Sequence, residues 1–238
     1  MKNYKLSIIV PAYNEEATIA NTIKGLQAQT YKNIELIIIN NNSKDKTLEI
    51  AKKLTDKVFT ETKQGYIHAV LRGAAESTGD LITFCDADSF YPTNWAEKVV
   101  NEFEKDDNIV VVYGPANTHD ASKLQNWLNG IGYILFLYIS KLFRLDNTAG
   151  FNFVMKKSAY LKAGGYNPAY QKMSPDIELG KRLKKLGKVK LKTSIMVSSS
   201  YRRFADNGGI KTSIMFLKAW WAMVVGKAPN ISYEEYNK

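Results

Sequence analysis

Hydrophobic residues in the first half of the chain come in short runs, separated by stretches in which apolar positions recur at helical spacing. Runs rich in Ile, Val and Leu are typical of buried strands, and their alternation with helices is typical of a mostly parallel sheet. The pattern predicts strands at 6–10, 35–39, 58–60, 81–85 and 109–113. Ligands of such sheets bind beyond the carboxyl ends of the strands, so we expect the loops at 11–15, 40–45, 62–65 and 86–91 to converge.

The stretches between these runs carry stripes of apolar residues at spacings of three and four, which predict helices. Asn14 precedes the first stripe and Ser43 the second, and both residue types are common at helix N-caps. Further stripes predict helices near 67–74 and over 93–103, and the basic segment 181–192 predicts an amphipathic helix followed by a strand. The whole pattern predicts an α/β fold with a mostly parallel central sheet flanked by helices.

Two stretches of the second half are rich in aromatic residues. Residues 124–140 form a 17-residue stretch without charge that is apolar on every side of a helical wheel. At about 1.5 Å per residue it reaches only about 25 Å, short of the ~30 Å hydrocarbon core of a bilayer. Residues 213–226 form the second stretch, and lysines flank both. The pattern suits a buried helix and also a helix lying in a membrane interface.

Composition narrows the class of protein. The chain has 238 residues, of which 45% are hydrophobic and 24% charged, so one globular domain with additions is expected. Cys85 is the single cysteine and cannot form an internal disulfide, and the N-terminus leads into a strand pattern without resembling a signal peptide. We therefore expect a cytoplasmic protein, with peripheral attachment to the inner face of the cell membrane if the aromatic stretches contact lipid.

The net charge of +10 is unevenly distributed along the chain. Residues 1–119 hold 13 Lys and Arg against 16 Asp and Glu, whereas residues 120–238 hold 20 against 7. A solvated surface is the simplest explanation of this excess, and a phosphate-bearing substrate or an anionic membrane surface is the more specific one. No nucleic-acid-binding motif is recognisable, so no nucleic acid partner is expected.

Asp86, Ala87 and Asp88 follow directly after a predicted strand. Two carboxylates one residue apart can hold Mg²⁺ or Mn²⁺, because such cations combine one or two carboxylates with phosphate oxygens and water. The cation would neutralise charge on a departing nucleoside diphosphate. A lone D-x-D is frequent in turns, but the expected carboxyl edge of the sheet favours a metal site here.

Several segments together carry a more specific signal. They are SIIVPAYNEE at 7–16, IIINNNSKDKT at 37–47, GDLITFCDAD at 79–88, and then GFNF, GGYNP and DIEL at 150–153, 164–168 and 176–179. In this order and spacing they resemble the family 2 glycosyltransferases of the GT-A fold, over roughly residues 5–205.

The resemblance implies a Rossmann-like GT-A domain over residues 1–205. Residues 1–115 would form the nucleotide-sugar-binding half, residues 116–205 the acceptor-binding half, and residues 206–238 a C-terminal helical extension and tail. The implied activity is inverting transfer of a sugar from a UDP- or GDP-linked donor to an acceptor hydroxyl or polyprenyl phosphate. The products would serve cell-envelope polysaccharide, glycolipid or glycoprotein synthesis.

The resemblance also implies roles for individual residues on the donor side. Pro11, Tyr13 and Glu15 would contact the nucleobase and ribose. Asp86, Ala87 and Asp88 would bind the ribose and the metal on the diphosphate, with Asp88 the more direct ligand and Asp86 the second. Arg202 and Arg203 are candidates for clamping the diphosphate, because a guanidinium group can bind phosphate through two hydrogen bonds.

Asp176 stands where the family places the general base that deprotonates the acceptor hydroxyl. The same residue, following Ser174 and Pro175, also fits the first turn of a helix. Pro175 replaces the first acid of the family's Glu-Asp pair, and Glu178 is a less suitable substitute. Asn40 departs from the family's Asp at a position associated with the nucleobase, which puts donor preference in doubt. The Gln-x-x-Arg-Trp motif of processive synthases is absent.

Two other functions fit the pattern less well. A sugar-phosphate nucleotidyltransferase shares the α/β pattern and the acidic pair, but it would need a Gly-rich, Arg-containing loop after the first strand, and residues 11–15 offer none. A non-enzymatic basic module that binds membrane or nucleic acid would account only for the charge of the second half.

Overall fold

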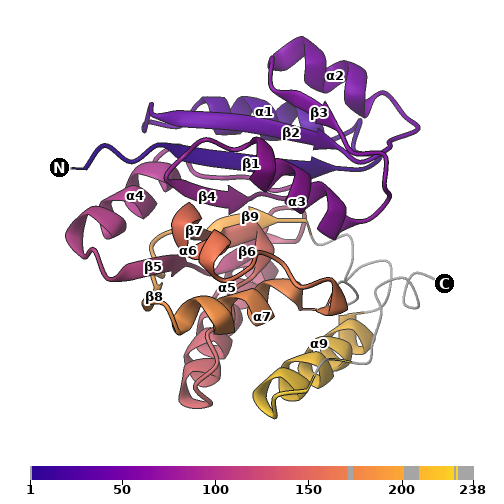
Figure 1. The fold of residues 1–238 in the computed structure, drawn as a ribbon. Helices are drawn as coiled ribbons and strands as arrows, with labels where there is room; N and C mark the ends of the chain where they lie inside the picture. The colour runs from indigo at the N-terminus through magenta and orange to yellow at the C-terminus, as the bar shows by residue number, and fades with distance from the viewer. Residues whose placement is uncertain (1, 171–173, 201–208, 228, 230–238) are drawn as a thin grey trace.

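The computed structural model describes residues 2–170, 174–200, 209–227 and 229. Its central sheet contains β1 (Leu6–Ala12), β2 (Ile34–Asn40), β3 (Val58–Thr60), β4 (Leu81–Phe84), β5 (Ile109–Tyr113), β7 (Phe153–Lys156) and β8 (Lys188–Leu191). The strand order is β3-β2-β1-β4-β7-β5-β8 (Figure 1). Only β7 runs antiparallel to its neighbours. The α/β expectation of a mostly parallel sheet flanked by helices is confirmed.

Helices cover both faces of the sheet. On one face the strands pack against α1 (Ile19–Gln27), α2 (Thr47–Leu54) and α4 (Trp95–Lys105); on the other lie α3 (Tyr66–Glu76), α6 (Lys157–Lys162) and α7 (Pro175–Lys184). Side chains alternate between the two faces along β1, so Ile8 and Val10 enter the first core while Ile9 enters the second. The strand runs are therefore mostly apolar because both faces are buried.

The strand β7 was not predicted from the sequence. It has four residues and follows a short 3₁₀ helix, η1 (Gly150–Asn152), so it lacks the long apolar run that marks β1 and β2. A second 3₁₀ turn, η2, spans Pro168–Tyr170. Because β7 inserts between β4 and β5, residues of the predicted acceptor half and donor half share one sheet.

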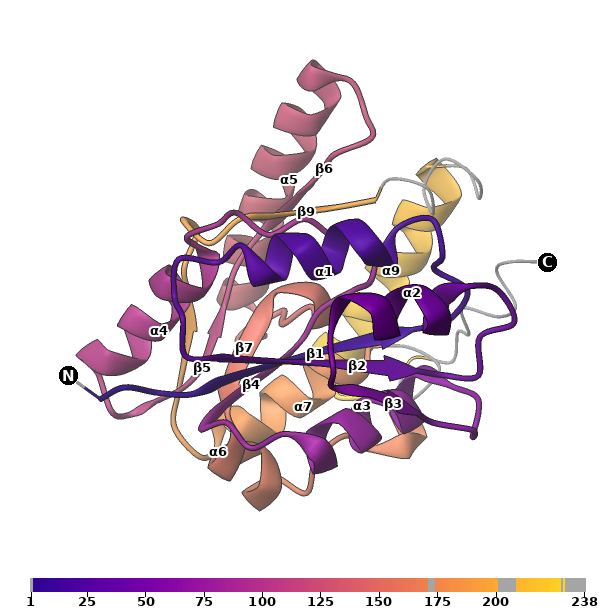
Figure 2. The ribbon, with the colours of Figure 1, turned by 90° about the horizontal axis from the view of Figure 1, so that it is seen from above.

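A smaller parallel pair of strands, β6 (Ala116–Thr118) and β9 (Val197–Ser199), adjoins α5 (Lys123–Leu142). In Figure 2, α5 extends away from the central sheet beside this pair. The last described helix, α9 (Gly209–Val224), contacts α5 through Trp220, whose Nε1 donates to Ser140 Oγ at 2.9 Å. No helix among the described residues is long and apolar enough to cross a bilayer.

Candidate active site

The loops that follow β1 and β2 are joined by hydrogen bonds at the carboxyl edge of the sheet. The Asn14 N–H donates to Ser43 Oγ at 3.1 Å, and Asn14 Oδ1 accepts from the Lys44 N–H at 2.8 Å. The Glu15 N–H donates to Thr47 Oγ1 at 2.7 Å. Asn14 adopts a left-handed φ of 54°, which its short polar side chain tolerates.

These contacts overturn the two predicted helix caps. Helix α1 begins at Ile19 after Thr18, and α2 begins at Thr47 after Lys46. Asn14 and Ser43 have the side chains of capping residues, but they use them to bond the two loops to each other. The predicted convergence of loops 11–15 and 40–45 is confirmed by the same hydrogen bonds.

Asn41 brings a third loop to this edge. Its backbone N–H donates to the Ala12 carbonyl at 2.8 Å. Its Nδ2 donates to the carbonyls of Glu61 at 3.0 Å and Lys63 at 2.8 Å, and its Oδ1 accepts from the Gly65 N–H at 2.8 Å. A single amide therefore fixes loop 62–65 beside the other two, using both donors and its acceptor. Nothing in the sequence distinguishes Asn41 from the asparagines on either side of it, so this role was not predicted.

The predicted nucleoside contacts lie on these loops. Asn40, the last residue of β2, is 2% exposed, and its Oδ1 accepts no hydrogen bond from the described residues. A buried polar atom without a partner costs about 1–3 kcal/mol, so a ligand that donates to Oδ1 would recover this energy. Pro11 is half-buried in register with Ile39, Glu15 is half-buried, and Tyr13 is 49% exposed at the rim.

The acidic pair lies directly beyond β4 on a turn that is held in place. Asp86 and Asp88 are half-buried, while Ala87 between them is buried and its carbonyl accepts from Thr22 Oγ1 of α1 at 2.7 Å. The chain two residues further on is fixed as well, because Phe90 exchanges backbone hydrogen bonds of 2.8 and 3.0 Å with Ser198 of β9. Both carboxylates therefore lie on a restrained loop.

The chemistry of this pair suits a cation that arrives with a phosphate ligand. Within the part of the chain that the structure describes, no three His, Cys, Asp or Glu side chains form a metal-holding cluster. Mg²⁺ and similar hard cations are commonly held by one or two carboxylates, with phosphate oxygens and water completing the coordination. Asp86 and Asp88 fit that arrangement.

Asp176 is the second residue of α7, after Pro175 at the first position. Its Oδ1 accepts from the Tyr166 hydroxyl at 2.5 Å, and its backbone carbonyl accepts from Thr148 Oγ1 at 2.8 Å. A Cβ on Gly150 would stand 2.9 Å from Asp176 Oδ2, so this approach needs glycine. Desolvation raises the pKa of Asp176 to about 6, although hydrogen bonds from Tyr166 and Gly150 partly oppose the rise.

Tyr66, at the start of α3, packs against Tyr166, the residue whose hydroxyl donates to Asp176. Its ring packs edge-on against Tyr166, with 6.4 Å between the ring centroids. Desolvation raises the pKa of the Tyr66 hydroxyl most, and the charges of Asp176 and Asp86 raise it further. The Tyr66 side chain is 37% exposed, so it lies at the rim of the site beside the tyrosine that bonds to Asp176. Neither tyrosine was named from the sequence, although Tyr166 lies within the GGYNP segment.

Arg202 and Arg203 fall within 201–208, outside the described residues.

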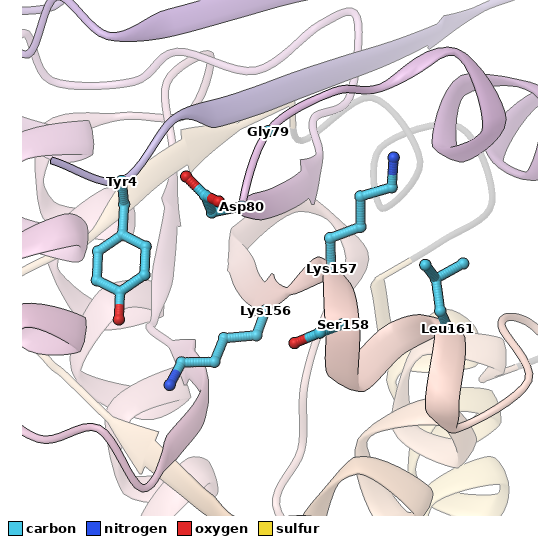
Figure 3. Close-up of a pocket in the computed structure, with 7 residues that line it drawn as sticks. All are labelled: Tyr4, Gly79, Asp80, Lys156, Lys157, Ser158 and Leu161. Atoms are coloured by element: carbon cyan, nitrogen blue, oxygen red, sulfur yellow. The ribbon is translucent and has the colours of Figure 1, made fainter. Parts of the chain in front are cut away.

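A hollow of about 440 Å³ lies at the opposite edge of the sheet, lined by Tyr4, Gly79, Asp80, Lys156, Lys157, Ser158 and Leu161 (Figure 3). Asp80 precedes β4, whereas Asp86 follows it, so this hollow is separated from the acidic pair by the length of the strand. Its two lysines donate to backbone carbonyls of Asp107 and Ser77. These contacts indicate a structural role for both lysines.

Comparison with known proteins gives several relatives that are described as glycosyltransferases or as a mannosyltransferase. The probable glycosyltransferase YdaM of Bacillus subtilis is 30% identical over 201 residues, covering 77% of this chain and 47% of the relative. The dolichol-phosphate mannosyltransferase of Pyrococcus furiosus is 30% identical over 135 residues, covering 52% of this chain and 36% of the relative. The chain thus spans about half or less of the length of these two relatives.

Similar solved structures share the fold at low sequence identity. A mannosyltransferase from Pyrobaculum calidifontis, in complex with GDP-Man and Mn²⁺, has a TM-score of 0.72 at 16% identity and covers 96% of this chain and 67% of its own. Glucosyl-3-phosphoglycerate synthase from Mycobacterium tuberculosis, with Mn²⁺, UDP-glucose and phosphoglyceric acid, has a TM-score of 0.65 at 17% identity, covering 94% of this chain and 80% of its own.

The family described as Glycosyl transferase family 2 matches residues 7–164. This match starts in β1 and runs past α6, so it includes the joined loops after β1 and β2 and the turn that carries Asp86 and Asp88. Since it also extends over well over half of the sequence, the chain belongs to glycosyl transferase family 2.

Proposed function

We propose that this protein transfers a glycosyl group from a nucleoside diphosphate sugar to an acceptor hydroxyl, with inversion at the anomeric carbon. The observation that carries the proposal is a chain of contacts: Asp86 and Asp88 follow β4, and Phe84 at the end of β4 packs against Tyr166, whose hydroxyl donates to Asp176. The two carboxylates that could bind a metal and diphosphate, Asp86 and Asp88, thus lie at the same edge of the sheet as the candidate base, Asp176. The donor class is taken from similar structures, which hold GDP-Man or UDP-glucose together with Mn²⁺.

On the donor side, the joined loops after β1 and β2 would hold the nucleoside. Pro11, Tyr13 and Glu15 would line the base and ribose, and Asn40 Oδ1 would accept a hydrogen bond from the nucleobase. Asp86 and Ala87 would contact the ribose, and Asp88 would bind Mg²⁺ or Mn²⁺ on the diphosphate. The bound cation would stabilise the negative charge of the leaving diphosphate. Arg202 or Arg203 would add a further positive charge there.

On the acceptor side, Asp176 would be the general base. With a pKa of about 6 its carboxyl is mostly ionised at neutral pH, yet basic enough to take a proton from a hydroxyl in the transition state. The acceptor oxygen would form its bond to the anomeric carbon as the bond to the diphosphate breaks, and the hydroxyl proton would move to Asp176. The diphosphate would leave with the electron pair.

The acceptor itself is a sugar hydroxyl in this proposal, with polyprenyl phosphate as the alternative. A phosphate acceptor is already ionised and needs no base. The loss of turnover on replacing Asp176 therefore distinguishes a hydroxyl acceptor from a phosphate acceptor. Residues 1–115 would supply most donor contacts and residues 116–205 the acceptor contacts. Cell-envelope polysaccharide, glycolipid or glycoprotein synthesis is the expected setting.

A donor screen tests the activity. The protein is incubated with UDP-glucose, UDP-GlcNAc or GDP-Man, with Mg²⁺ or Mn²⁺ and with an added sugar that offers its hydroxyl groups as acceptor, and released nucleoside diphosphate is measured. We expect metal-dependent release from one donor, abolished by Asp88→Ala and unchanged by Asp56→Asn, which alters an exposed aspartate before β3. Release that persists in Asp88→Ala would contradict the metal-site assignment. Failure to release nucleotide from UDP- and GDP-linked sugars of every kind would contradict the proposed activity.

A further inference from the structure

Helix α5 carries apolar residues on two opposite faces, and only one of them is buried. Gly130, Leu137 and Ser140 are its buried residues. The opposite face is exposed along the whole helix, with Leu142 82% and Trp127 62% exposed. Spacings of three and four residues place its other members in one stripe, which includes Leu124, Leu128, Ile131, Leu135 and Tyr138. The sequence had left open whether this helix is buried, and the structure shows that one face is not.

Helix α9 repeats this arrangement. Met215, Ala219 and Met223 are buried, whereas Ile214, Leu217, Trp221 and Val225 are exposed at spacings of three and four. Lys211 and Lys218 are exposed and share this spacing, so they lie along the same side of the helix.

The exposed faces of the two helices meet. The Phe143 ring, just beyond α5, lies edge-on to Trp221 with 6.2 Å between the centroids, and both side chains are about half exposed. Behind them Trp220 packs against Phe136 and Phe143 at 5.7 and 5.3 Å. In Figure 1 both helices lie below the body of the molecule. Together they form one apolar surface, here called the α5–α9 surface.

The charged residues of the two helices and their immediate flanks have a single sign. Residues 121–145 and 207–229 contain no Asp or Glu, while Lys123, Arg144, Lys211, Lys218 and Lys227 are all exposed. Trp and Tyr beside Lys and Arg are the residues that occupy the headgroup region of a bilayer, where the rings bury their apolar part and the cations meet lipid phosphates.

We propose that the α5–α9 surface docks on an anionic lipid bilayer, with both helices lying in the interface. Neither helix is able to span the membrane, which agrees with an interfacial placement. A second copy of the chain is a poorer occupant: a two-fold dimer would bring the surface onto itself and so place its cations opposite cations. Lipid phosphates supply the opposite charge. The proposal stands independently of the glycosyl transfer, because it concerns binding and needs no donor.

Vesicle flotation of the full chain tests this proposal. Vesicles of phosphatidylcholine alone are compared with vesicles of equal parts phosphatidylcholine and phosphatidylglycerol. We expect strong binding to the anionic vesicles and weak binding to the neutral ones. Salt should weaken the former, because the Debye length falls from about 10 Å at 0.1 M to about 3 Å at 1 M.

Matched variants separate the apolar and the charged contributions. Leu142→Ser or Trp221→Ser should weaken binding about tenfold, whereas Leu161→Ser, on the exposed face of α6, should not change it. Lys218→Gln should weaken binding to anionic vesicles about fivefold, and Lys52→Gln on α2 should leave it unchanged. All five side chains are substantially exposed, so circular dichroism should show folded proteins.

Three outcomes would overturn the proposal. One is the absence of wild-type binding to both vesicle types. Another is equal binding by Trp221→Ser, Lys218→Gln and the wild type. The third is a stable dimer in sedimentation that Leu142→Ser dissociates, which would make the α5–α9 surface a self-association surface instead.

Discussion

The Tyr166 hydroxyl donates a hydrogen bond of 2.5 Å to Oδ1 of Asp176. Tyr166 reaches this position after two consecutive glycines with positive φ, 80° at Gly164 and 66° at Gly165, a conformation that residues with a Cβ rarely adopt. Its ring is buried against Phe84 of β4, with 5.3 Å between the centroids. The two glycines of the GGY segment therefore turn the chain so that the buried Tyr166 can hydrogen-bond to the candidate base, Asp176.

The first prediction concerns the pH dependence of turnover. With the pKa of Asp176 raised to about 6, activity should rise as pH increases through about 6, because only the ionised carboxyl can accept a proton. Tyr166→Phe removes a hydrogen bond that stabilises the carboxylate, so the pKa of Asp176 should rise and the acid limb should move to higher pH. A hydrogen bond to a charged group is worth about 1.5–3 kcal/mol, so we expect a move of about one to two pH units.

Tyr160→Phe is the matched control for this pH profile. Tyr160 packs in the same aromatic cluster as Tyr166, 6.2 Å away, but Oδ1 of Asp176 accepts its hydrogen bond from Tyr166. Removal of the Tyr160 hydroxyl should leave the acid limb in place. Identical pH profiles for Tyr166→Phe and the wild type would show that the Tyr166 hydroxyl does not tune the base.

The second prediction concerns the nucleobase. Asn40→Ala removes the buried amide oxygen that has no partner among the described residues. UDP or GDP should therefore bind about tenfold more weakly, which corresponds to the loss of about one hydrogen bond. Inorganic pyrophosphate with Mn²⁺ has no base and should bind equally well to both proteins in calorimetry. Equal losses for nucleotide and pyrophosphate would place Asn40 in a structural role.

The third prediction concerns stability and Glu35. Its side chain is 2% exposed and accepts from Ser7 Oγ at 2.6 Å, from the Thr78 N–H at 2.8 Å and from Lys57. Burial by itself would raise the pKa of Glu35, but the hydrogen bonds from Lys57, Ser7 and Thr78 outweigh it and lower the pKa to about 2. A lowered pKa means that the stabilisation is complete above the unfolded-state pKa and is lost as pH falls towards 2.

Glu35→Gln should therefore lower the free energy of unfolding by about 2–3 kcal/mol at pH 7. The difference in the free energy of unfolding between the variant and the wild type should shrink as pH falls below about 4.5. The wild-type carboxylate then contributes less stability, because its pKa is lower in the folded than in the unfolded state. Urea unfolding at several pH values measures this. Glu49→Gln breaks an exposed ion pair with Lys53 and should leave the free energy of unfolding almost unchanged. Equal effects of the two substitutions would contradict the buried network.

Much of the fold could be predicted because its signals are local. The runs at 6–10 and 35–39 are apolar except for Ser7 and Glu35, since both faces of the sheet are covered, and this property is visible in the residues themselves. The convergence of the loops followed from strand direction alone. Asn14 and Ser43 were misassigned because a side chain that can cap a helix can equally bond to a neighbouring loop, and only the folded chain decides between them.

The candidate site was predicted less completely than the fold. Asp86, Asp88 and Asp176 were predicted as site residues from their motifs and stay predictions. The contacts of Tyr166 and Tyr66 depend on tertiary structure, and no periodicity in the sequence indicates them. The exposure of α5 was also undecidable from the sequence, because both of its faces are apolar and only packing shows which one is covered.

The most direct test of the central claim is the turnover of Asp176→Asn, measured together with the dissociation constant of the donor in the presence of Mn²⁺. Asparagine keeps the shape of the side chain and its acceptor for Tyr166 but cannot take a proton. We expect an unchanged donor dissociation constant and a turnover lowered by about 10²- to 10⁴-fold. Turnover close to that of the wild type, with the donor still bound, would contradict the assignment of Asp176 as the base and would favour a phosphate acceptor.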